Sequence, residues 1–92
     1  MDIRKVFGLN MRRLRLAAGL NQEDAADSIG IGRAHAGAME RGQQNVTLMI
    51  LEKVAEGFRC RPMELLDESA ARGFAQSHAA SKIPRKRRRK RN

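Results

Sequence analysis

The fold of this chain is decided by residues 19–42, which read GLNQEDAADSIGIGRAHAGAMERG. Asn21 is a favourable N-cap residue, and the two acidic residues that follow Gln22 complement the positive end of a helix dipole. This pattern predicts a short helix over residues 22–29, which ends at a glycine. A second short helix is expected over residues 33–40. The three residues between them, Gly30-Ile31-Gly32, leave room only for a tight turn.

Helical periodicity recurs on both sides of this stretch, and strand-like alternation is not found. Before it, apolar residues follow helical spacing from Ile3 to Ala18, and Gly19 suits a left-handed C-terminal cap. After it, Thr47 is expected to cap a helix that extends to about Gly57. Pro62 suits the first position of a last helix, which is expected to extend to about Ala71. The sequence therefore predicts a compact, all-α domain of five helices.

Length and residue usage exclude several classes of protein. A chain of 92 residues is long enough for one small domain. Its single cysteine, Cys60, cannot form an internal disulfide, and His35 and His78 lie too far apart for a zinc-binding pattern. No apolar run is long enough to span a membrane. We therefore expect a soluble, cytoplasmic protein without a metal, a cofactor or an evident small-molecule ligand.

The positive charge is concentrated at the C-terminal end of the chain. The sequence has 19 Lys and Arg against 10 Asp and Glu, and eight of the 19 lie in residues 82–91, where there is no acid. Residues 1–81 therefore carry 11 − 10 = +1. Because the end of the chain also has few apolar residues, disorder is expected from about Gly73. This predicts a domain over residues 1–72 and a flexible linker with a basic tail over residues 73–92.

From Leu9 to Leu66 the chain resembles the Cro/C1-type (XRE-family) helix-turn-helix domain, which occurs in small phage repressors and restriction–modification controllers. The matching features follow in order along the chain: Leu14-Arg15, Gly19-Leu20-Asn21-Gln22, Ala25, Ile31, Glu40-Arg41-Gly42, and Pro62 with Glu64-Leu65-Leu66. The resemblance implies a lambda-repressor-like fold whose third helix enters the major groove of double-stranded DNA. It also implies a homodimer on a near-palindromic operator, with recognition helices about 34 Å apart.

The resemblance assigns base contacts to the third helix. Arg33 aligns with a base-reading position, where its forked guanidinium can donate two hydrogen bonds to guanine. Ala34 and Ala38 align with further base-facing positions, and their methyl groups either contact thymine methyl groups or only fill space. His35 either contacts DNA or is simply exposed.

The third helix has unusually small side chains. Gly37 lies in its interior, where glycine costs about 1 kcal/mol relative to alanine. It either permits close approach to the groove floor or backbone, or occupies a weakly constrained position. Ala36 stands where the family usually buries a larger residue, so we expect a thin core that leaves Ile31 and Met39 to hold the helix. Sequence discrimination by such a helix would depend partly on DNA shape.

Residues that flank the two helices are expected to bind phosphate. The family uses the glutamine at the position of Gln22 as a phosphate clamp, and backbone N–H groups at a helix start attract anions. The other candidates are Asn21, Arg41, Gln43, Gln44 and Asn45, of which the last three could equally form only a polar turn. The resemblance also pairs Arg15 with Glu40 as a structural ion pair.

The fourth helix has a wider apolar band than one core face requires. Its core stripe is expected to consist of Leu48, Leu51, Val54, Ala55 and Phe58. Met49 and Ile50 lie beside that stripe, and with Met63 they are predicted to form a homodimer interface. The alternative is a monomer in which this helix is broadly buried. Arg59 replaces the usual family glycine, so backbone strain is expected there.

Three other functions compete with that of a DNA-binding regulator. The basic tail could add sequence-independent phosphate contacts, or bind RNA or an acidic partner, through Arg85, Lys86, Arg87, Arg88, Arg89, Lys90 and Arg91. The fold could instead serve a protein partner, as in an antitoxin or anti-regulator. An enzyme is disfavoured, because GRAHAG lacks the Lys and Ser/Thr of a phosphate-binding loop. The sequence favours a sequence-specific transcriptional regulator, most simply a repressor that occludes a promoter.

Overall fold

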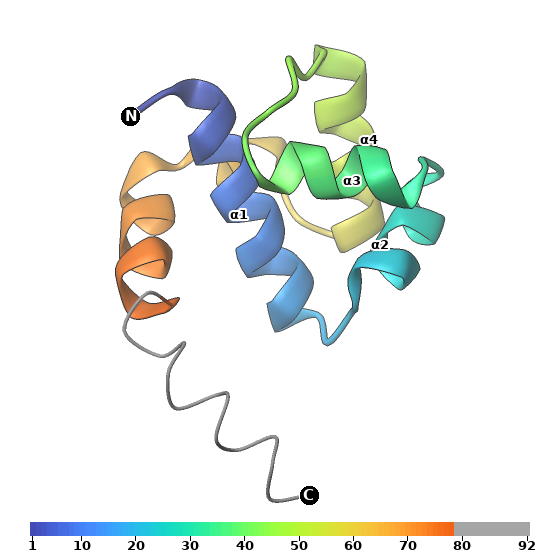
Figure 1. The fold of residues 1–92 in the computed structure, drawn as a ribbon, viewed down its shortest axis with the longest axis horizontal. Coiled ribbons are helices and arrows are strands. Elements are labelled where there is room, and N and C mark those ends of the chain that lie inside the picture. Colours follow the sequence, from blue (N-terminus) through green and yellow to red (C-terminus); the bar gives the residue numbers. More distant parts are fainter. Residues whose placement is uncertain (79–92) are drawn as a thin grey trace, which may run out of the picture.

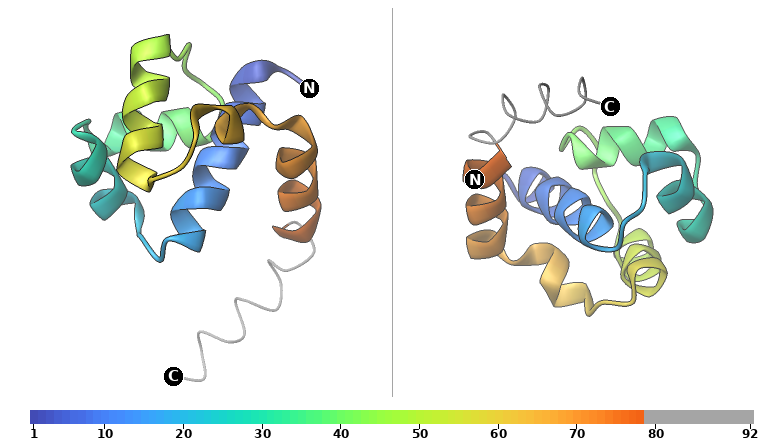
Figure 2. Two further views of the ribbon diagram at one scale, coloured as in Figure 1. Left: turned by 180° about the vertical axis from the view of Figure 1, so that it is seen from behind. Right: turned by 90° about the horizontal axis from the view of Figure 1, so that it is seen from below.

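A computed structural model describes residues 1–78, and all regular structure within that range is helical. The elements are α1 (Ile3–Ala17), α2 (Gln22–Ile29), α3 (Arg33–Glu40), α4 (Leu48–Phe58), the 3-10 helix η1 (Pro62–Leu66) and a further helix over residues 68–78. Helix α1 lies between the α2–α3 pair on one side and residues 68–78 on the other, as Figures 1 and 2 show. The predicted all-α architecture is confirmed.

Local signals at the helix ends explain why the central helices have the bounds predicted from sequence. The side chain of Asn21 accepts a hydrogen bond from the Asp24 backbone N–H at 2.8 Å, which caps α2. Gly30 ends α2 in the left-handed conformation, with φ of 85°. Thr47 caps α4 in the same way as Asn21 caps α2, through the Ile50 backbone N–H at 3.1 Å. None of the helices in residues 1–78 is long and apolar enough to cross a membrane.

The predicted last helix, from Pro62 to about Ala71, is wrong in one respect. The structure has two elements there, separated at Asp67, whose backbone is extended and whose carboxylate caps the following helix at Ala70 N–H. A buried side chain on α1 holds this break in place. The Nδ2 of Asn10 donates hydrogen bonds to the carbonyl groups of Leu65 at 3.1 Å and Asp67 at 3.0 Å. The Asp67 carbonyl also accepts from the Ala71 backbone N–H at 3.1 Å, so Asn10 binds the chain where one helix ends and the next begins.

The expected loss of structure from Gly73 is also wrong for the first residues concerned. The helix over residues 68–78 continues through Gly73, and Ala71 within it is fully buried. The rings of Phe74 and His78 stack one turn apart, with centroids 3.8 Å from each other. The helix lies beside α1, on the side opposite α3 (Figures 1 and 2). The predicted basic tail lies outside the described residues.

The core lies where α1, α2, α3, α4 and η1 meet. Its largest buried apolar side chains are Phe7, Met11, Ile29, Met39, Val54 and Leu65. Leu48, which was predicted to lie in the core, is 82% exposed, and Ile3, the first residue of the apolar stripe on α1, is 61% exposed. Each is the first residue of its helix, so its side chain projects beyond the end of the packed elements. The helical spacing of the apolar residues was predicted correctly on both helices. Ile3 and Leu48 lie outside the core because each stands at the end of its helix.

Helix α3 compensates for its small side chains by lying very close to α1. A Cβ atom at Gly8 would lie 2.5 Å from the carbonyl oxygens of both Met39 and Glu40. No side chain fits between the two backbones there, so α1 and α3 touch main chain to main chain. Ala36 and Met39 are consequently both 1% exposed. The core under α3 has few large side chains, as expected, but it excludes solvent.

Candidate nucleic-acid interface

A nearly buried ion pair fixes the position of the α2–α3 unit on α1. Arg15 donates to both oxygens of Glu40, from Nε to Oε2 at 2.6 Å and from Nη2 to Oε1 at 3.1 Å. The two side chains are only 9% and 4% exposed. Arg15 Nη1 also donates to the Leu20 carbonyl at 2.9 Å, and Gln22 Nε2 donates to Glu40 Oε1 at 3.2 Å. The pairing expected of Arg15 and Glu40 thus ties together α1, the α1–α2 loop, α2 and α3.

With its inner face held in this way, α3 exposes its first turn to solvent. Arg33, Ala34 and His35 are exposed, and Ala38 is half-buried, whereas Ala36 and Met39 point inward. Figure 1 shows α3 crossing the front of the molecule, where no other element covers it. The base-reading candidates from the sequence are therefore available to a ligand along one side of α3.

Arg33 has an intramolecular partner that sequence reasoning missed. Its Nη1 lies 3.6 Å from Glu23 Oε1 on α2, and both side chains are exposed to solvent. Exposed ion pairs of this kind contribute little, typically about 0–1 kcal/mol, because water competes for both charges. Arg33 can therefore exchange Glu23 for another acceptor at small cost.

Gly37 does not face the solvent side of α3. It is buried, and a Cβ atom there would lie 3.2 Å from Arg41 Nη1 and 3.6 Å from Gln22 Oε1. The missing side chain opens space for these two residues and not for the floor of a groove. The structure thus brings together two phosphate-binding candidates, one from the start of α2 and one from the end of α3.

The remaining polar candidates lie around the two helix ends. Asn21 is exposed, but its side-chain oxygen is engaged in capping α2. Arg41 is exposed, and its Nε donates to Gln43 Oε1 at 3.0 Å. Gln44 is half-buried, and Asn45 is exposed. These polar side chains lie at the start of α2 and in the segment that follows α3, which continues into Val46 and Leu48.

The apolar surface lies at the N-terminal ends of α1 and α4 and on η1. Two of the three residues predicted to form a dimer interface are exposed, Met49 at 69% and Met63 at 72%. The third, Ile50, is half-buried and packs against the core of its own chain. Sequence reasoning missed Ile3 and Leu66, and it placed Leu48 in the core. Leu48 is the first residue of its helix, and a side chain at that position can project beyond the packed elements. Its position in the helix could therefore have identified Leu48 as an exposed residue.

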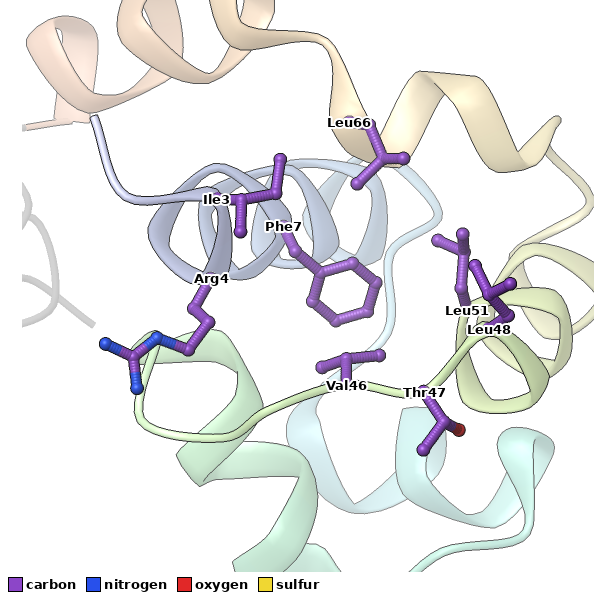
Figure 3. A pocket seen from close by; sticks show the side chains of 8 residues that line it. All are labelled: Ile3, Arg4, Phe7, Val46, Thr47, Leu48, Leu51 and Leu66. Carbon is purple, nitrogen blue, oxygen red and sulfur yellow. The ribbon is translucent and has the colours of Figure 1, made fainter.

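A shallow apolar hollow lies within this surface. It has a volume of about 190 Å³ and is lined mainly by Ile3, Phe7, Val46, Leu48, Leu51 and Leu66, as Figure 3 shows. Leu66 also lines a second hollow, which includes Met63 on η1. We refer to Ile3, Leu48, Met63 and Leu66 as the α4–η1 face.

The described part of the chain offers no metal centre. Residues 1–78 contain no group of three His, Cys, Asp or Glu side chains that could hold a metal ion. Cys60 is half-buried against the core, and burial, assisted by the Glu64 carboxylate, raises the pKa of its thiol. A raised pKa disfavours the thiolate that a metal ligand or nucleophile requires. The predicted phosphate-binding tail, from Arg85 to Arg91, lies outside the described residues.

Comparison with known proteins assigns this arrangement to a family. Residues 11–65, more than half of the chain, match the helix-turn-helix family HTH_3. The control protein C.BamHI of Bacillus amyloliquefaciens is 34% identical over 67 residues, which cover 72% of this chain and 83% of that protein. The phage CTXphi transcriptional repressor RstR of Vibrio cholerae is 36% identical over 64 residues, covering 70% of this chain and 58% of that protein.

A solved structure supports the same assignment. The restriction-modification controller protein C.AhdI from Aeromonas hydrophila is 42% identical and superposes with a TM-score of 0.65, covering 67% of this chain and 94% of that chain. Members of this family are transcription regulators and not enzymes, and the GRAHAG segment lies on the turn before α3 and on α3 itself rather than in a phosphate-binding loop. The chain is therefore a member of the Cro/C1-type helix-turn-helix family of transcriptional regulators.

Proposed function

We propose that this protein is a sequence-specific repressor that binds a palindromic DNA operator as a homodimer. One observation carries the proposal: a buried ion pair holds α3 rigidly on α1, while the first turn of α3 is open to solvent. A helix held in this way can enter the major groove without rearrangement, so little free energy is lost on ordering it.

In this mode Arg33 reads the most informative base. Its guanidinium leaves Glu23 and donates to O6 and N7 of a guanine, a contact that discriminates by about 1–3 kcal/mol. Ala34 and Ala38 contact thymine methyl groups, and His35 lies beside the backbone. Since so few side chains on α3 can donate hydrogen bonds, part of the discrimination comes from the shape of the duplex.

Phosphate contacts come from both ends of the α2–α3 unit. The backbone N–H groups at the start of α2, beside Asn21 and Gln22, attract one phosphate group. Arg41, with Gln43 and Gln44 beyond it, lies at the end of α3 and reaches a second part of the backbone. Contacts of this kind orient the protein on DNA and carry no sequence information themselves. The basic tail, Arg85 to Arg91, adds sequence-independent affinity that weakens with salt.

Dimerisation is proposed to occur through the α4–η1 face together with Met49. Large apolar side chains exposed side by side are typical of an interface. A two-fold dimer would pair this face with itself and place two copies of α3 about 34 Å apart. Ile50, half-buried in its own chain, would lie at the edge of this interface. Repression then requires only that the bound dimer occludes a promoter in the cytoplasm.

Selection from random DNA duplexes tests this proposal. The full chain and a chain without residues 82–92 should both enrich the same palindrome at physiological salt. Arg33→Lys should lose preference at one base pair of each half-site, because lysine cannot form the forked contact. Arg72→Lys, on the far side of α1, serves as the matched control. If neither chain enriches a site, and binding disappears with the tail, the fold serves a protein or RNA partner instead.

A further inference from the structure

Glycine is an unfavourable residue at position 37 of α3, where a larger side chain would fit if its neighbours moved. Glycine in a helix interior is less favourable than alanine, and α3 has only eight residues to hold it together. The three heavy atoms nearest to a Cβ atom here would be the ends of two flexible side chains, Arg41 Nη1 at 3.2 Å and the Gln22 amide at 3.6 and 3.8 Å. Folding alone therefore does not require glycine at this position.

Both neighbours of Gly37 are held by other hydrogen bonds. Gln22 Nε2 donates to Glu40, which leaves Gln22 Oε1 lying against Gly37. Arg41 Nε donates to Gln43 Oε1, and this leaves Nη1 lying across the helix. The space above Gly37 is therefore bordered by the guanidinium from the end of α3 and by the amide from the start of α2.

We propose that Gly37 is a positioning residue for phosphate binding, which keeps open the space that the Arg41 guanidinium and the Gln22 amide border. This inference rests on the proposed function, because it concerns how the protein holds a DNA backbone. A methyl group at residue 37 would displace the Arg41 guanidinium toward solvent, since Arg41 is exposed and its hydrogen bond to Gln43 is open to water as well. The phosphate contact would be lost, although α3 would be a better helix.

The experiment compares Gly37→Ala with Gly73→Ala in the full chain. Gly73 also lies within a helix, and a Cβ atom there would meet nothing within 4 Å. Both changes should raise the Tm by a few degrees, because alanine favours a helix. Only Gly37→Ala should weaken binding, by about threefold to tenfold, and it should do so equally for the selected operator and for unrelated duplexes. Its log–log salt slope should fall by about 0.9 for each chain bound.

Arg41→Ala identifies the group that acts. It should reduce the salt slope by the same amount, and adding Gly37→Ala to it should cause no further loss of affinity. If the double variant binds less tightly than Arg41→Ala, the methyl group contacts DNA itself and the proposal is overturned. An unchanged salt slope in Arg41→Ala overturns it as well, even if Gly37→Ala does not fold.

Two failures are distinguishable in this design. If the unmodified chain binds no DNA duplex, the proposed function fails. If it binds an operator, and Gly37→Ala binds that operator equally tightly with the same salt slope, only the role of Gly37 fails.

Discussion

Helix α3 crosses two neighbours, and each crossing contains a buried glycine with a different purpose. At the α1–α3 crossing, a side chain on Gly8 would meet two backbone carbonyl oxygens at 2.5 Å, and neither can move without shifting a helix. At the α2–α3 crossing, the atoms nearest to a side chain on Gly37 would be the ends of the Gln22 and Arg41 side chains. Packing requires glycine at residue 8, whereas the fold would also accept alanine at residue 37. Burial alone does not distinguish these two cases; the neighbouring atoms do.

The largest effect should come from Glu40, which belongs to both crossings. Its carbonyl lies against Gly8, and its carboxylate binds Arg15 and Gln22. Glu40→Ala leaves the Arg15 guanidinium buried without its partner, so we expect a loss of about 3–5 kcal/mol in the free energy of unfolding. Urea titration measures this loss. The double variant Arg15→Met, Glu40→Met should recover much of it, and failure to do so would show that the ion pair is not the cause.

Gly8→Ala tests the rigid crossing directly. The added methyl group must push α1 and α3 apart, and overpacking of this kind typically costs about 1–3 kcal/mol. The comparison between the crossings predicts opposite signs, with Tm falling for Gly8→Ala and rising for Gly37→Ala. If Gly8→Ala is as stable as the original chain, the two backbones are not in contact and the comparison fails.

The α4–η1 face provides a contrast, because its apolar residues lie outside any crossing. Leu48→Ser with Met63→Ser should leave the unfolding of a single chain nearly unchanged, since both side chains are already exposed. The proposed dimer should dissociate at least tenfold more readily, a loss of about 1.4 kcal/mol or more in the free energy of association. Sedimentation equilibrium measures this change. Leu16→Ser is the control, because Leu16 is also exposed but lies at the other end of α1.

The smallest effect should occur at Arg59, where the backbone favours glycine but the sequence does not provide it. The backbone of Arg59 adopts the left-handed conformation, with φ of 57°. This is the strained backbone that the sequence predicted at this position. Arg59→Gly should stabilise the chain by about 1 kcal/mol, because glycine adopts this conformation without a steric penalty. Differential scanning calorimetry detects such a gain. Gly30→Ala, at φ of 85°, should change stability in the opposite direction.

The sequence predicted those parts of the fold that depend on near neighbours. The bounds of α2 and α3 were correct, because Asn21 and Gly30 act within a few residues of the helix ends that they set. The break at Asp67 could not be predicted in this way. It depends on Asn10, more than fifty residues earlier, whose amide binds two carbonyl groups at the break.

The candidate site shows the same limit. Arg33, Ala34 and His35 could be assigned from motif order, and the structure leaves all three exposed. The Glu23 partner of Arg33 and the side-chain neighbours of Gly37 are set by how α2 and α3 cross, which spacing along the chain does not reveal. Leu48 fits a helical stripe, but only the surrounding elements determine whether its side chain is covered.

The Asn10 hydrogen bonds also have a geometric consequence for a dimer joined through the α4–η1 face. They fasten η1, with Met63 and Leu66, to α1, while Gly8 and Arg15 fasten α3 to the same helix. In the proposed dimer, α1 would then connect the partner subunit to the DNA. The spacing between half-sites that such a dimer accepts would be set by a helix that is not expected to contact any base. Substitutions on α1 would then change which operators are bound by changing the distance between the two copies of α3.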